Sequence, residues 1–171
     1  MEEFHVADHH GTSKLLTLVD LLLSVIVLCH VIIGGHYDCG GVRACTKNLD
    51  HQPPLENWLR NIRDVYRLHR AELDAIEDPE ARHRRLVEIN VIEQCINLFK
   101  TGVVQHRRLQ TFNDETFPFT QPRIHACVYD PKDGKLRQLQ VDFKEYVKDL
   151  HGIYNLYKID DKSGMLGGSE H

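Results

Sequence analysis

The stretch VIIGGHYDCGGVRAC, residues 31–45, decides how this chain is interpreted. An apolar run ends in two glycines, and His36 and Cys39 follow in a loop that two further glycines close. Zinc takes imidazole nitrogen and thiolate sulfur in tetrahedral sites, and a two-residue gap in a turn lets both side chains face one ion. The flanking glycines leave room for the backbone to wrap it. Standing alone, however, one His-x-x-Cys pair is better explained by a glycine turn with a small buried cysteine.

The composition of the 171 residues is that of an ordinary globular protein with one domain, residues 1–171. The net charge of −4 shows no basic excess, which argues against a nucleic-acid partner. Five cysteines without a framework spacing indicate reduced thiols. We therefore expect an intracellular, cytoplasmic protein, with a mitochondrial location left open.

Residues 15–33 are long and apolar enough to raise the question of a membrane span. Asp20 lies in the middle of this run, and a charge at bilayer depth costs about 2.5–3.5 kcal/mol. The sequence instead predicts a packed helix over 13–24 and a strand over 25–33. Because this strand is β-branched without alternation, it is predicted to be buried on both faces.

Hydrophobic periodicity and turn signals predict the elements that follow. These are a helix over 55–76, a helix from Pro79 with Asp78 as its cap and Gly102 as its stop, a loop over 106–122, a hairpin of strands 124–130 and 135–141, and a terminal helix or arm from 143. Residues 1–12 are expected to be loose and 160–171 a flexible tail. The order predicts an α/β fold with a small, mainly parallel mixed sheet flanked by helices. Ligands of such sheets bind beyond the carboxyl ends of the strands, where His36 and Cys39 lie.

The motif GGHYDCGGVRA resembles the second zinc motif of the β-class carbonic anhydrases, in which Gly-His-x-x-Cys-Gly-Gly supplies two metal ligands. The stretches LENWLRNIRD, RLVEINVIEQCINLFKTGVVQ and IHACVYDPKDGKL are similar to the corresponding parts of the fungal and plant-type enzymes. The resemblance implies zinc as cofactor, His36 and Cys39 as its ligands, and Gly40 and Gly41 as loop residues close to metal and substrate. It also implies reversible hydration of carbon dioxide to bicarbonate, and a homodimer or higher homo-oligomer.

The family's earlier motif, Cys-x-Asp-Ser-Arg, does not occur in this sequence. It supplies the third zinc ligand and a catalytic Asp/Arg pair, so no catalytic residue is assigned and the chain is expected to be N-terminally truncated or divergent. Cys29 is too far from His36 along the strand, about 20 Å. Cys45 could approach if the turn is helical, and the VADHHG stretch (6–11) could fold back. Without the strand that carries the motif, strand 25–33 should keep one partner and expose an apolar edge.

Two functions stay open at this point. One is a zinc-dependent carbonic anhydrase, a lyase, with weak or lost activity. The alternative is a non-catalytic homologue that associates with a complete carbonic anhydrase subunit.

Several other residues are given ordinary roles, namely Asp38 as a solvated turn residue, His30 and His125 as core histidines, Arg82, Arg84 and Arg85 as a solvated face, and Trp58 as packing.

Overall fold

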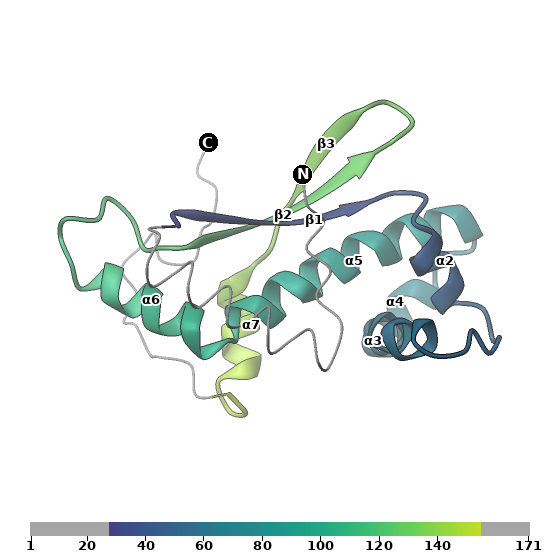
Figure 1. Ribbon diagram of the computed structural model, residues 1–171, viewed down its shortest axis with the longest axis horizontal. Helices are drawn as coiled ribbons and strands as arrows, with labels where there is room; N and C mark the ends of the chain where they lie inside the picture. The colour runs from purple at the N-terminus through teal and green to yellow at the C-terminus, as the bar shows by residue number, and fades with distance from the viewer. Residues whose placement is uncertain (1–27, 155–171) are drawn as a thin grey trace.

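The computed structural model describes residues 28–154 (Figure 1). Its elements, in chain order, are β1 (His30–His36), α2 (Gly40–Cys45), α3 (Leu55–Leu68), α4 (Arg70–Asp74), α5 (Pro79–Phe99), α6 (Gly102–Phe112), β2 (Arg123–Asp130), β3 (Lys135–Leu139) and α7 (Phe143–Leu150). The predicted helix over 13–24, the loose segment 1–12, the tail 160–171 and the first residues of the predicted strand 25–33 lie outside the described range.

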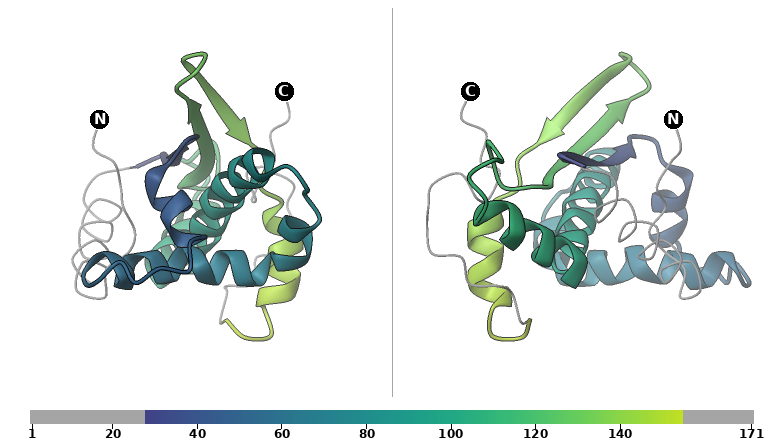
Figure 2. Two further views of the ribbon diagram at one scale, coloured as in Figure 1. Left: turned by 90° about the vertical axis from the view of Figure 1, so that its right-hand side faces the viewer. Right: turned by 60° about the vertical axis from the view of Figure 1, so that its left-hand side comes forward.

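The three described strands form one mixed sheet in the order β1–β2–β3. β1 runs parallel to β2, with His30 opposite Arg123 and His36 opposite Tyr129. β2 and β3 are antiparallel, and their tight turn contains Gly134 at a φ of 71°. This confirms the predicted hairpin, which extends beyond the helices in both views of Figure 2. The α/β fold with a small mixed sheet is likewise confirmed.

The helix α5 covers one face of this sheet and explains a glycine in β1. A Cβ atom on Gly35 would lie 2.5 Å from Val91 Cγ2 of α5, so only glycine lets strand and helix approach this closely. On the opposite face of β1 the Ile32 side chain is 60% exposed, and exposed residues alternate along the strand. The prediction that this strand is buried on both faces is therefore wrong. Within the described part of the chain, β1 is an edge strand, as the expectation of a single partner required.

α5 begins as the sequence predicted. The Asp78 carboxylate accepts hydrogen bonds from the N–H groups of Glu80 and Ala81 at 3.4 and 3.0 Å, and proline occupies the first turn. Gly102, predicted to stop this helix, begins α6 instead. The loop predicted over 106–122 is therefore wrong in its first half, because α6 continues to Phe112.

The helix predicted over 55–76 is divided into α3 and α4. His69 leaves the helical conformation with φ −106° and ψ 22°, and its Nε2 atom lies 2.8 Å from the Glu93 carboxylate of α5. This contact attaches the junction of α3 and α4 to α5, the longest of the described helices. The terminal segment forms the helix α7, one of the two predicted alternatives.

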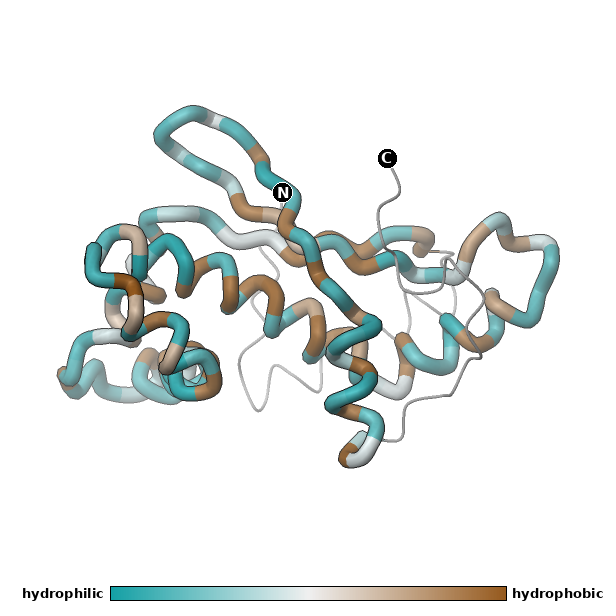
Figure 3. Tube along the Cα trace, turned by 180° about the vertical axis from the view of Figure 1, so that it is seen from behind, coloured by the Kyte–Doolittle hydropathy of each residue, from teal (hydrophilic) through white to brown (hydrophobic). Residues whose placement is uncertain are grey.

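The core lies between the sheet and the helices and draws a side chain from almost every element. Its largest fully buried members include Leu59 of α3, Leu73 of α4, Leu86 of α5, Val104 of α6 and Val128 of β2. Hydrophobic positions recur along α5 beneath the sheet (Figure 3). No helix within residues 28–154 is both long and apolar enough to cross a membrane.

The arginines at the start of α5 were expected on a solvated face, and this is wrong. Arg82 donates to the Ile76 carbonyl at 2.9 Å, Arg84 pairs with Asp130 of β2 at 2.9 Å, and Arg85 pairs with Glu72 of α4 at 2.6 Å. All three are half-buried. They connect α5 to its neighbours.

Candidate metal centre

The loop between β1 and α2 carries both predicted zinc ligands. His36 is the last residue of β1, and Cys39 is the residue that directly precedes α2. Asp38 turns the chain between them with a φ of 58°, in the left-handed region that aspartate tolerates. The Tyr37 N–H donates to the Tyr129 carbonyl at 2.9 Å, which continues the strand pairing by one residue. The loop thus leaves the sheet at the carboxyl end of a parallel strand, as predicted.

The His36 ring is held in a form that suits a metal ligand. Its Nδ1 atom lies 3.0 Å from the Tyr37 carbonyl oxygen. A carbonyl can only accept, so Nδ1 carries the proton and Nε2 keeps the lone pair. Nε2 has no hydrogen-bond partner among the described residues. Metal-binding histidines commonly bind through one nitrogen while the other donates to a backbone carbonyl.

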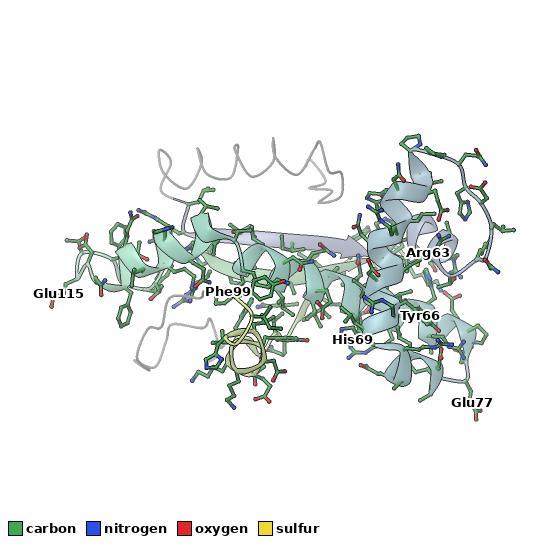
Figure 4. The ribbon with its side chains drawn as sticks, turned by 90° about the horizontal axis from the view of Figure 1, so that it is seen from below. Arg63, Tyr66, His69, Glu77, Phe99 and Glu115 are labelled. Atoms are coloured by element: carbon green, nitrogen blue, oxygen red, sulfur yellow. The ribbon has the colours of Figure 1, made fainter. Side chains whose placement is uncertain are left out.

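Cys39 presents a free, half-buried thiol beside two glycines with different surroundings. A Cβ on Gly41 would lie 2.5 Å from the Trp58 ring and 3.9 Å from Cys39 Sγ. A Cβ on Gly40 would meet nothing within 4 Å. Trp58 therefore packs on the loop, as its predicted packing role implied. Arg63 of α3, labelled in Figure 4, secures the far end of α2 by donating to the Cys45 carbonyl at 3.0 Å.

The residues between the two ligands are anchored to α5. Tyr37 is only 3% exposed, and its hydroxyl donates to Glu88 at 2.6 Å. Burial, reinforced by the hydrogen bond to Glu88, raises the pKa of this phenol. Asp38 is a turn residue with a partly exposed side chain, as predicted, and it also accepts a hydrogen bond from Arg43 at 3.0 Å.

The candidates for a third ligand within the described chain do not complete a site. Cys45 is buried and donates from Sγ to the Val42 carbonyl at 3.1 Å, and burial raises the pKa of its thiol to about 12. It is therefore a neutral thiol at physiological pH. Cys29 is half-buried and directly precedes β1, at the end opposite to His36, so it lies too far from His36 to share a metal ion, as expected. Residues 6–11 lie outside the described range.

The two histidines predicted for the core form a pair across the strands. His30 Nδ1 and His125 Nε2 are 2.8 Å apart, and the rings are stacked with centroids 5.0 Å apart. His125 is half-buried, but His30 is exposed, so the core assignment of His30 is wrong. Burial, followed by the charges of His30 and Arg123, lowers the pKa of His125.

Sequence reasoning missed His83 of α5. It is 7% exposed, and its Nε2 atom has no hydrogen-bond partner in the part of the chain that the structure describes. Burial lowers the pKa of His83, and the Arg43 charge lowers it further. The helix position of His83 carried no signal, because its surroundings come from a loop far away in sequence.

By donor type, His36 and Cys39 fit zinc. Among residues 28–154, however, no three His, Cys, Asp or Glu side chains come together in a way that could hold a metal ion. A catalytic zinc site needs three protein ligands and one open position. The described residues therefore bring together only the two predicted ligands, His36 and Cys39, and do not complete a zinc site by themselves.

The fold and the loop together define a class of protein: an α/β domain with a His-x-x-Cys loop at the carboxyl end of a parallel strand. We name residues 36–41 the metal loop, after the ligands predicted for it. The sequence pattern of the family described as Carbonic anhydrase matches residues 6–136. The chain is 49% identical over 129 residues to a carbonic anhydrase of Emericella nidulans, covering 75% of this chain and 53% of that protein. It belongs to the β-class carbonic anhydrase family.

Solved structures of β-carbonic anhydrases share the fold of this chain. The β-carbonic anhydrase CafA of Aspergillus fumigatus superposes with a TM-score of 0.66 at 27% identity, covering 88% of this chain and 66% of that one. One of two tetrameric β-carbonic anhydrases of Sordaria macrospora shares the fold with a TM-score of 0.62 at 21% identity, covering 79% of this chain and 62% of that one. The chain spans about half the length of the curated relatives that it matches.

Proposed function

We propose that this chain takes part in the reversible hydration of carbon dioxide to bicarbonate, with His36 and Cys39 as two of the zinc ligands. Family membership supports the reaction. One observation of the described residues carries the zinc assignment: the Tyr37 carbonyl holds His36 Nδ1, which leaves Nε2 to bind a metal three residues before the Cys39 thiol. Gly40 and Gly41 then form the loop beside metal and substrate.

When bound, zinc acidifies a water molecule to a pKa of about 7, which is the chemistry that carbon dioxide hydration needs. The third ligand must come from outside residues 28–154, because within this range no third His, Cys, Asp or Glu side chain joins His36 and Cys39. Carbon dioxide and bicarbonate are the proposed substrate and product, and a homodimer or higher homo-oligomer is the proposed assembly. The tetrameric relatives of Sordaria macrospora support that assembly. A cytoplasmic location belongs to the same proposal.

Zinc content and activity test this function. The purified chain should hold about one zinc ion per chain in elemental analysis and hydrate carbon dioxide above the buffer rate in stopped-flow measurements. His36→Ala and Cys39→Ser should each reduce the zinc content to background. His151→Ala is the matched control, because this exposed histidine lies at the end of α7 and should leave zinc unchanged. Zinc near zero in a folded wild-type chain would refute the proposal.

A second candidate function is association without catalysis. It is favoured by β1, which is an edge strand in the described part of the chain. Edge strands readily pair with another chain. A zinc-free, stable oligomer, or a stable complex with a complete carbonic anhydrase subunit in sedimentation experiments, would support this alternative.

A further inference from the structure

The two residues that separate His36 from Cys39 are both held by one face of α5. Tyr37 contacts Glu88 and Arg84, and Asp38 reaches Glu80 through Arg43. Glu80, Arg84 and Glu88 are spaced four residues apart, and such positions share one face of a helix. We call these three side chains the α5 polar stripe.

The first attachment is a buried one. The Tyr37 hydroxyl donates to Glu88 at 2.6 Å, and the Arg84 guanidinium lies over the Tyr37 ring at 3.5 Å from its centre. Arg84 is itself fixed by Asp130 at 2.9 Å. Because Tyr37 follows His36 directly, this attachment fixes the backbone carbonyl that orients the His36 ring.

The second attachment is a forked ion pair at the surface. Arg43 donates to the two carboxylate oxygens of Glu80 at 3.0 and 2.8 Å, and the same guanidinium donates to Asp38 at 3.0 Å. Lys132 adds a longer contact to Asp38 at 3.9 Å. Bidentate guanidinium–carboxylate pairs constrain direction as well as distance. Since Asp38 precedes Cys39, this fork limits where the thiol can lie.

We propose that Glu80 and Glu88 are positioning residues for the metal loop: through Arg43–Asp38 and Tyr37 they set the separation of His36 Nε2 and Cys39 Sγ, and thereby the affinity for zinc. This inference rests on the proposed function, in which those two atoms are zinc ligands. Outer groups that orient metal ligands typically contribute about 10- to 100-fold to metal affinity.

The test uses Glu80→Gln and Tyr37→Phe in the full chain, with zinc and Co(II) as probes. The first change weakens the fork to Arg43, and the second removes the hydroxyl bonded to Glu88. Dissociation constants come from competition with a chromophoric chelator, and the visible bands of Co(II) report the ligand geometry. Each variant should bind zinc about 10- to 100-fold more weakly than wild type and should show altered Co(II) bands.

Glu145→Gln is the matched control. Glu145 lies in α7 and also forms an ion pair, with Lys148 at 2.9 Å. Among the described residues it forms no hydrogen bond or ion pair with the metal loop or with the α5 polar stripe, so its loss should leave zinc affinity within about twofold, well short of the 10-fold minimum expected for a positioning group. Thermal unfolding of all variants separates a change in affinity from a loss of fold.

The outcomes distinguish the two proposals. Wild-type protein that binds neither zinc nor Co(II) would overturn the zinc assignment, and the positioning role with it. Wild-type protein that binds metal, with Glu80→Gln and Tyr37→Phe matching it in affinity and Co(II) bands, would overturn the positioning role alone. Equal losses in Glu80→Gln and Glu145→Gln would also overturn it, because the effect would then not depend on the loop.

Discussion

Replacement of Gly41 by alanine should destabilise the protein, whereas the same change at the neighbouring Gly40 should not. The added Cβ at position 41 would lie 2.5 and 2.6 Å from two atoms of the Trp58 ring, far inside van der Waals contact. At position 40 it would meet nothing within 4 Å. Both glycines are in the first turn of α2, so both variants share any gain in helix propensity.

The shared gain cancels in the comparison of the two variants. Alanine in place of a helical glycine stabilises by up to about 1 kcal/mol, which is the expectation for Gly40→Ala. Overpacking of a well-packed site costs about 1–3 kcal/mol. Gly41→Ala should therefore have a free energy of unfolding about 1–3 kcal/mol below that of Gly40→Ala.

Urea unfolding at neutral pH measures this difference. Trp58 is the only tryptophan of the chain, so its fluorescence also reports directly on the contact with Gly41. The emission maximum of the folded Gly41→Ala variant should shift, and that of Gly40→Ala should stay at the wild-type position. Equal stabilities of the two variants, with unchanged emission, would refute the close packing of Trp58 on the metal loop.

Two further predictions concern the core and the response to acid. Leu59 of α3 is 0% exposed, so Leu59→Ala should lower the free energy of unfolding by about 2–5 kcal/mol, and a loss below 1 kcal/mol in urea titrations would contradict its central place. The hydrogen bond from Arg84 holds the pKa of Asp130 below its usual value of about 4. The stabilisation from this lowered pKa is present above pH 4 and is lost as the pH falls through the native pKa. The difference in free energy of unfolding between wild type and Asp130→Asn should therefore become smaller in acid. A difference that stays constant with pH would contradict this prediction.

Local chemistry allowed much of the fold to be predicted. The hairpin followed from Pro131-Lys132-Asp133-Gly134, and the start of α5 followed from Asp78-Pro79, because each signal acts within a few residues of itself. Gly102 was misleading because one glycine can end a helix or begin the next. The burial of β1 could not be predicted, since it depends on how many strands and helices lie beside the strand.

The same contrast between local signals and long-range contacts applies to the metal loop. His36 and Cys39 could be found from their spacing and from the family motif, and the structure leaves their role as zinc ligands a prediction. Their supports could not be found, because Tyr37 and Glu88 are 51 residues apart and Arg43 and Glu80 are 37 apart. Which residues meet across such distances depends on the register of α5 against the loop, and a single sequence carries no signal for that register.

The dependence of the metal loop on α5 has a consequence for how the protein opens. The first turns of α5 hold the loop, while its later turns pack under the sheet beside Gly35. Segments that share their contacts unfold as one cooperative unit. Fraying of the first turn of α5 would therefore release the Glu80–Arg43–Asp38 attachment of the metal loop, while Tyr37 stays bonded to Glu88 and to Tyr129. If Cys39 binds zinc as proposed, the retention of the metal and the opening equilibrium of this helix end are thermodynamically coupled.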